Sequence, residues 1–141
     1  IIISTPAGEP VNLLSGKPET QAICERDQGM KQAIAARADI GMSAGKLAAQ
    51  VAHGAVGAML KSPTELQRRW LDAGQKKVVL RVPDATAITQ LAAAATDAGL
   101  AHRVIRDAGH TELAASTVTV IAVGPAEDAA IDAVTGDLPL W

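Results

Sequence analysis

Apolar and polar positions alternate along the chain in two kinds of segment, which predict strands and helices. Short apolar runs bounded by Gly, Pro or Asp predict strands at residues 31–37, 76–82, 101–106 and 117–123, the last ended by Gly124-Pro125. Longer segments rich in Ala and Leu predict helices at about 43–60, 63–71, 84–98 and 126–134. The order β-α-α-β-α-β-β-α predicts a single compact α/β domain with a mixed four-stranded sheet flanked by helices. The last two strands are joined by a short loop and should be antiparallel neighbours.

Capping residues and an irregular tail mark the limits of this pattern. Ser43, Ser62 and Asp84 can each accept a hydrogen bond from an amide of the helical turn that follows. Residues 1–29 show no sustained period and are interrupted by prolines. We expect a flexible tail at 1–29 and a folded domain at 30–141. The tail has no basic start followed by a long apolar run, so no secretory signal is predicted.

The helix expected at 43–60 carries one narrow polar stripe. Lys46, Gln50 and His53 recur at intervals of four and three residues, which places them on one line along a helix. Most other positions of this helix are small and apolar, as in a helix that packs on several sides. The stripe can face a cleft, or it can be the solvent-facing side of a surface helix, and the pattern leaves both interpretations open.

The composition excludes several kinds of covalent link, metal site and membrane segment. The chain has one cysteine, Cys24, so an internal disulfide and a multi-cysteine metal site are excluded. The single cysteine fits a reducing, cytoplasmic compartment. No apolar run approaches the length of a membrane span.

The net charge of −2 conceals an asymmetry between the two halves. Residues 30–81 carry nine Lys or Arg against three acidic residues, whereas residues 82–141 carry two against eight. This distribution indicates either a basic face for an anionic partner or two halves whose charges interleave.

Two loops hold residues with catalytic potential. The first, at 41–46, reads GMSAGK; it is one residue too short for a phosphate-binding loop and is followed by Leu47 instead of Ser or Thr, so a nucleotide triphosphatase is rejected. A helix N-terminus with a lysine still suits an anion. In the second loop, at 107–119, Asp107, His110 and Thr111 follow a strand and could activate water. Alternatively, Asp107 only caps backbone amides of a turn. His53 and His110 alone do not make a zinc site, which normally needs three protein ligands.

Three motifs, in order, resemble those of one known family, the peptidyl-tRNA hydrolases of archaea and eukaryotes. The motifs are KQAIAARADIGMSAGKLAAQVAHGAV at 31–56, GQKKVVLRVPD at 74–84 and DAGHTELAASTVTVIAVGP at 107–125. The resemblance continues to Trp141, covers 30–141 and leaves out 1–29. It implies an α/β domain, often dimeric, that hydrolyses the ester between a peptide and the terminal ribose of tRNA with neither metal nor organic cofactor.

By motif position, the resemblance implies six site residues: Lys46, Gln50, His53, Asp107, Thr111 and Thr119. The chain departs from the family pattern at a few positions. His110 stands where the family usually has Arg, Gly54 where it has Ala, and Ala115-Ser116-Thr117 where it has Pro-Gly-Ser. If the family's Gly requires a positive φ, Ser116 would reshape this loop.

The resulting hypothesis is ester hydrolysis by an activated water. Asp107, with the Thr111 hydroxyl, orients or deprotonates the water, and Lys46 stabilises negative charge on the carbonyl oxygen or contacts the ribose-phosphate end of the tRNA. Alternatively, Lys46 lowers the pKa of Asp107, which then only holds the geometry. Gln50, His53 and Thr119 are expected to position the substrate. We expect tRNA to bind mainly through its phosphates, at a basic set consisting of Lys61, Arg68, Arg69, Lys76 and Lys77.

Two rival functions remain open. A non-catalytic RNA- or protein-binding module on the same scaffold would bind tRNA without turnover. A small-molecule hydrolase would cleave simple esters in the absence of tRNA. Both rivals differ from the main hypothesis in an activity that can be measured.

Overall fold

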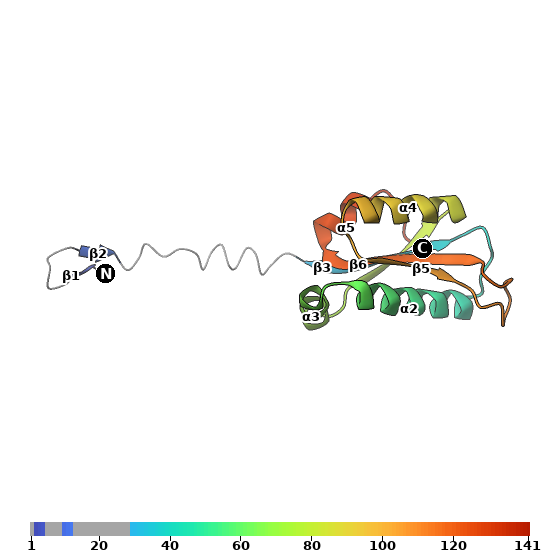
Figure 1. The fold of residues 1–141 in the computed structure, drawn as a ribbon, viewed down its shortest axis with the longest axis horizontal. Coiled ribbons are helices and arrows are strands. Elements are labelled where there is room, and N and C mark those ends of the chain that lie inside the picture. The colour runs from blue at the N-terminus through green and yellow to red at the C-terminus, as the bar shows by residue number, and fades with distance from the viewer. Residues whose placement is uncertain (1, 5–9, 13–28) are drawn as a thin grey trace.

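The centre of the fold is a four-stranded sheet, seen in a computed structural model that describes residues 2–4, 10–12 and 29–141. Its strands are β3 (Met30–Arg37), β4 (Lys77–Val82), β5 (His102–Arg106) and β6 (Val118–Glu127), in the order β4-β3-β6-β5. β3 is parallel to β4 and antiparallel to β6, and β6 is antiparallel to β5. The predicted mixed sheet and the antiparallel pairing of the last two strands are confirmed (Figure 1).

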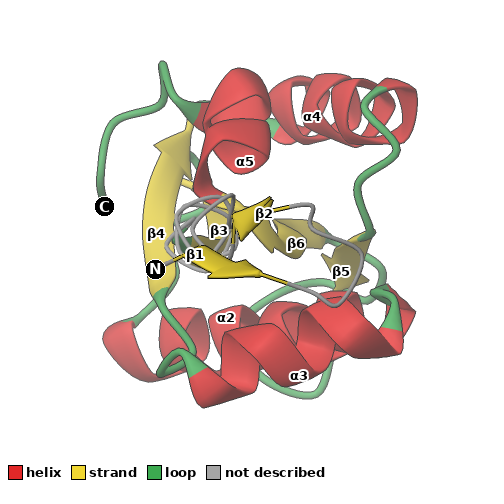
Figure 2. Ribbon diagram, turned by 90° about the vertical axis from the view of Figure 1, so that its left-hand side faces the viewer, coloured by secondary structure: helices red, strands yellow, loops and turns green. Residues whose placement is uncertain are grey.

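Helices cover both faces of this sheet (Figure 2). On one face lie α2 (Ala44–Lys61) and α3 (Thr64–Asp72), and on the other lie α4 (Ala85–Asp97) and α5 (Asp128–Thr135). Successive side chains of a strand point to opposite faces. Accordingly, Ala33 and Ala35 belong to the core under α4 and α5, whereas Ile34 and Ala36 belong to the core under α2. The predicted order of elements is confirmed.

Small residues allow α2 to lie close to the sheet. A Cβ atom on Gly54 would stand only 3.2 Å from the Cβ of Ala122 and 3.3 Å from a methyl group of Val120. Ala55 and Ala58 are buried beside it. Because the buried face of α2 packs so closely against the sheet, the side chains along the side of the helix lie next to β5 and β6.

The predicted end of the last strand at Gly124-Pro125 is wrong, because β6 continues to Glu127. The register between β3 and β6 shifts here, so that Gly124 and Pro125 both stand opposite Gln32 before pairing resumes. The side-chain nitrogen of Gln32 donates to the Gly124 carbonyl at 3.1 Å and so gives it a partner within the bulge. A proline normally ends a central strand because it lacks an N–H, but a bulge accommodates it.

Two of the three predicted helix caps are confirmed. Ser43 and Asp84 each accept a hydrogen bond from an amide of their own helix. Ser62 does not cap α3, because Pro63 takes the capping position and the Ser62 hydroxyl donates to the Ala58 carbonyl at 3.1 Å instead.

The C-terminal segment covers one edge of the sheet. Leu140 pairs with Leu80 of β4, and the amide of Arg81 donates to the Pro139 carbonyl at 2.8 Å. The Arg81 guanidinium lies over the Trp141 ring, 5.4 Å from its centroid. The opposite edge is β5, and in the described part of the chain no segment pairs with its outer side.

The tail predicted for residues 1–29 falls mostly outside the described residues. Within it, β1 (Ile2–Ser4) and β2 (Pro10–Asn12) pair in antiparallel fashion. Runs of three residues are too short to produce a readable hydrophobic period, so the sequence did not predict them. None of the helices in the described ranges is long and apolar enough to cross a membrane.

Candidate functional site

A cavity of about 440 Å³ opens between the first turns of α2 and the loop that joins β5 to β6. Lys46, Gln50 and His53 line it from the helix, so the polar stripe faces a cavity. Asp107 and Thr111 line it from the loop. The fold therefore brings together the two segments that the sequence marks for chemistry. We call this space the site cavity.

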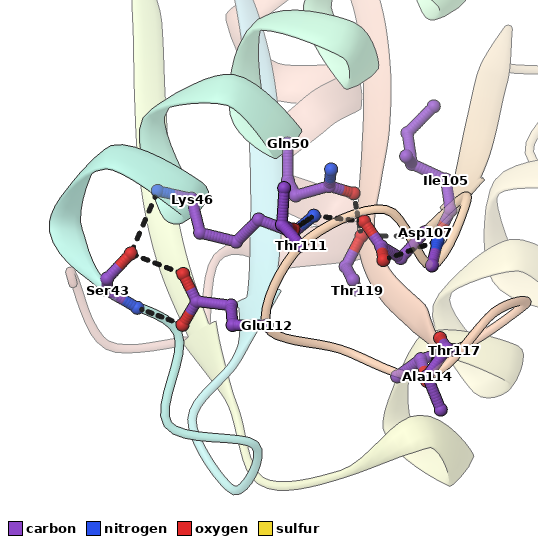
Figure 3. Close-up of polar contacts among 11 residues, drawn as sticks. Ser43, Lys46, Gln50, Ile105, Asp107, Thr111, Glu112, Ala114, Thr117 and Thr119 are labelled. Carbon is purple, nitrogen blue, oxygen red and sulfur yellow. Dashed lines mark hydrogen bonds and ion pairs between the residues drawn. The ribbon is translucent and has the colours of Figure 1, made fainter.

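Lys46 connects the helix to the loop (Figure 3). Its ammonium group donates to one carboxylate oxygen of Asp107 and, at 2.5 Å, to the hydroxyl of Thr111. Only 9% of the Lys46 side chain and 3% of the Asp107 side chain are exposed. An ammonium has three N–H donors, so one is left for a group that enters the site cavity.

Asp107 makes two contacts, one of which is the turn-capping contact that the sequence left as an alternative. One carboxylate oxygen faces Lys46, while the other accepts the amide of Gly109 at 2.8 Å, as a turn-capping aspartate does. The hydrogen bond from Lys46 lowers the pKa of the Asp107 carboxyl below its ordinary value of 3.8, and the Gly109 amide and the electrostatic effects of Lys46 and His110 act in the same direction against the effect of burial. Asp107 is therefore ionised at neutral pH.

Gln50 and Thr119 form a second, buried contact under the site cavity. The Thr119 hydroxyl donates to the side-chain oxygen of Gln50 at 2.6 Å, and both residues are buried. Thr119 lies where the register between β5 and β6 shifts, which leaves it opposite no single residue of β5. Because its oxygen is engaged by Thr119, the Gln50 amide keeps its nitrogen as a donor, which has no partner among the described residues.

Glu112 is a site residue that the sequence analysis missed. Its carboxylate accepts the amide of Ser43 at 3.1 Å and the Ser43 hydroxyl at 2.5 Å (Figure 3). These hydrogen bonds lower the pKa of Glu112 below its ordinary value. The N-terminus of α2 was expected to suit an anion, and the chain itself provides that anion, which ties the loop to the helix. The one available signal was this affinity for an anion, since nothing in the sequence pairs residue 112 with residue 43.

The departure at Ser116 falls on a special backbone position. Ser116 has φ +65°, in the left-handed region that favours glycine. Its amide donates to the Asp107 carbonyl at 2.7 Å, so the turn that holds Asp107 depends on this conformation. The loop keeps the geometry that a glycine would adopt easily, at a conformational cost of about 1–2 kcal/mol.

The basic residues expected to bind tRNA lie towards the other end of α2. About 22 Å of helix separates Lys46 from Lys61, which ends α2. The others lie on α3, just before β4 or at its first residue, and most of them form ion pairs within the chain. The ion pairs are Arg68 with Glu65 (2.7 Å), Arg69 with Glu127 (2.8 Å) and Lys76 with Asp128 (2.8 Å), and the Lys77 ammonium lies 4.5 Å from the Trp70 ring centroid.

The charges of the two halves interleave. Besides the pairs of Arg69 and Lys76, Lys31 binds Asp132 at 2.6 Å, and Lys46 binds Asp107. Much of the basic excess of the first half is therefore neutralised inside the domain. Within the ranges that the structure describes, no group of three or more His, Cys, Asp or Glu is placed to hold a metal ion.

Comparison with known proteins finds matches to one protein family. Residues 30–141 match the family model described as peptidyl-tRNA hydrolase PTH2. A peptidyl-tRNA hydrolase of Haloquadratum walsbyi is 50% identical over 112 residues, which is 79% of this chain and 100% of that protein. Peptidyl-tRNA hydrolase 2 of Saccharomyces cerevisiae is 39% identical over 121 residues, 79% of this chain and 58% of that protein. These matches confirm the resemblance carried by the three motifs.

We predict that replacing Lys46 by Met raises the pKa of the Asp107 carboxyl. In the parent this pKa lies below 3.8, so the pair stabilises the fold at and above that pH, and the stabilisation is lost as the pH falls through the lowered pKa. A ¹³C NMR titration of the Asp107 carboxyl should give a higher midpoint in Lys46→Met than in the parent. Lys31→Met, which breaks a different ion pair, should leave the midpoint unchanged. Equal midpoints in the parent and Lys46→Met would contradict the assignment.

We also predict that Ser116→Gly stabilises the domain. Glycine adopts positive φ without the clash of a Cβ atom, so the free energy of unfolding in urea should rise by about 1 kcal/mol. Ser116→Ala is the matched control, because it removes the hydroxyl and keeps the Cβ atom. If alanine stabilised the domain as much as glycine, the backbone explanation would be wrong.

Proposed function

We infer the reaction from one premise: the chain belongs to the PTH2 family of peptidyl-tRNA hydrolases. It hydrolyses the ester between a peptide and the terminal ribose of tRNA, and so returns the tRNA to translation. The observation that supports this most strongly is the nearly buried Lys46–Asp107 pair at the wall of the site cavity. Since the substrate is a product of translation, we expect the protein to act in the cytoplasm.

In the reaction that we propose, a water molecule attacks the ester carbonyl in the site cavity. The ionised Asp107 accepts a hydrogen bond from this water and takes its proton as the new C–O bond forms. The remaining N–H of Lys46 stabilises the negative charge that develops on the carbonyl oxygen. The bond to the ribose oxygen then breaks, and the proton held by Asp107 passes to that oxygen. The products are a free ribose hydroxyl and a peptide carboxylic acid, which releases the second proton of the water to solvent and becomes a carboxylate.

The lowered pKa of the Asp107 carboxyl determines how this residue takes part in the hydrolysis. A carboxylate stabilised by Lys46 is a weak base, so its main contribution is to orient the water, with proton transfer late in the step. Thr111 accepts one N–H of Lys46 and so directs the ammonium towards Asp107. In the alternative considered from the sequence, Lys46 lowers the pKa of Asp107, which then only holds the geometry of the site. That alternative differs from this proposal in whether the carboxylate also contacts the water.

Gln50, His53 and Thr119 are assigned to positioning. Thr119 fixes the orientation of the Gln50 amide, which leaves its N–H groups to donate to the substrate. His53 is exposed and lies one helical turn beyond Gln50, at the wall of the site cavity. A side chain there can contact the part of the substrate next to the ester.

We predict that the protein releases free tRNA from N-acetyl-aminoacyl-tRNA in the presence of EDTA. Lys46→Met and Asp107→Asn should each lower kcat by about two to three orders of magnitude, because each removes a group that acts on the developing charge or the water. Asp97→Asn, at an exposed carboxylate that ends α4, is the control and should retain full turnover.

Three outcomes would contradict this function. Turnover abolished by EDTA would overturn the metal-free reaction. Salt-dependent tRNA binding without turnover would indicate a binding module. Hydrolysis of simple esters at a rate that tRNA does not affect would indicate a small-molecule hydrolase.

A further inference from the structure

A second cavity, of about 880 Å³, lies between the C-terminal half of α2 and β5, and we call it the α2–β5 groove. His53 and Arg106 line both this groove and the site cavity, so the two spaces adjoin. The groove follows α2 as far as Lys61, about 22 Å along the helix from Lys46. A linear chain bound at the site cavity can therefore continue along this groove.

The groove is lined by cations that have no acidic partner. Lys61, Arg103 and Arg106 line it, and all three are exposed. In the part of the chain that the structure describes, none of them forms an ion pair, although Arg106 donates to the Ser116 carbonyl at 3.2 Å. Arg68 and Lys76, by contrast, are both neutralised by carboxylates. Among the described residues, Lys77 and Arg81 of β4 also lack an ion pair, but they lie over the Trp70 and Trp141 rings. The other unpaired Lys and Arg side chains are the three that line the groove beside the site cavity.

The walls of the groove suit the ribose and base faces of a single strand. Val56 is 54% exposed and Leu60 is 69% exposed on the α2 side. A Cβ atom on Gly57 would lie only 2.7 Å from Cγ of Arg103, so the stem of this arginine crosses the helix at the glycine. Apart from the imidazole of His53 the lining contains no aromatic ring, and its other polar side chains are the cations Lys61, Arg103 and Arg106, which suit phosphates. Such a surface follows a backbone without selecting a sequence.

We propose that the α2–β5 groove holds the single-stranded 3′ end of tRNA, with its phosphates on Lys61, Arg103 and Arg106. The strand passes His53 and places the ester at Lys46 and Asp107. This inference rests on the proposed function and identifies which part of the substrate lies on which surface. It also assigns the main tRNA contacts to this groove instead of to the basic residues of α3 and early β4.

Charge distinguishes RNA from the other linear part of the substrate, the peptide. Peptides carry side chains of either sign, whereas every nucleotide of a strand carries one negative phosphate. The groove has three unpaired cations and no acidic residue along it, which matches the repeated negative phosphates of a nucleotide strand. All tRNAs end in the same single-stranded sequence, so a groove that holds this end through its phosphates can accept every one of them.

The test is the affinity for deacylated tRNA, measured by fluorescence anisotropy over a range of salt concentrations. Arg103→Gln should weaken binding about fivefold at 0.1 M salt and lower the slope of log K against log[salt] by about 0.7, the effect of one lost contact to a single strand. Arg103→Lys keeps the charge and should bind within twofold of the parent. Arg81→Gln, on the opposite edge strand, is the matched control and should not change the affinity.

A second probe locates the contact on the tRNA. For tRNA that lacks its 3′-terminal CCA, the parent and Arg103→Gln should bind equally, because the affected phosphates are absent. If Arg103→Gln bound intact tRNA as tightly as Arg81→Gln does, the proposal would be overturned. A raised KM for N-acetyl-aminoacyl-tRNA with no change in tRNA affinity would overturn it as well, and would place the peptide in the groove.

The same experiment separates this inference from the proposed function. Binding of deacylated tRNA requires no catalysis, so the groove can be verified in a protein that shows no turnover. Turnover by the parent with no effect of Arg103→Gln on tRNA binding would refute the groove and leave the reaction standing. Melting curves of each variant establish that an affinity change does not come from unfolding.

Discussion

The contact between Lys46 and Asp107 is the interaction on which the site depends. It joins the first turn of α2 to the end of β5, two segments that come from different parts of the chain. Both side chains are nearly buried, so removing either would leave a charge without its partner in a region of little solvent. The same contact keeps Asp107 ionised and directs the Lys46 ammonium, which makes one interaction responsible for both the local structure and the proposed chemistry.

Other features of the fold serve to maintain this contact. Gly54 lets α2 lie against β6 closely enough for its polar stripe to reach the loop. Glu112 binds the N-terminus of α2 and fixes the loop from a second side. The positive φ of Ser116 closes the turn around Asp107. The loop is thus held by hydrogen bonds and backbone conformation, with little apolar burial, which is why a single φ value there affects the site.

Much of the fold and part of the site follow from local sequence patterns. The order of strands and helices is readable because each element has its own hydrophobic period, and the stripe of Lys46 and Gln50 follows from helical spacing. What could not be predicted depends on residues distant in sequence. The bulge opposite Gln32 continues a strand through Gly-Pro, Glu112 meets a helix 69 positions earlier, and Arg69 is neutralised by a carboxylate near the other end of the domain. Charge counted along the sequence therefore indicated basic residues without revealing which of them remain unpaired.

The central claim is that Lys46 and Asp107 act as one unit in catalysis. The most direct measurement is a double-mutant cycle on kcat/KM with Lys46→Met, Asp107→Asn and the combination of both. Groups that act as a unit are strongly non-additive, because the first substitution already abolishes what the pair does together. The account predicts that the double variant is no more than about threefold slower than the slower single variant. Losses that multiply would contradict it, because they would mean that the two residues contribute to the reaction independently.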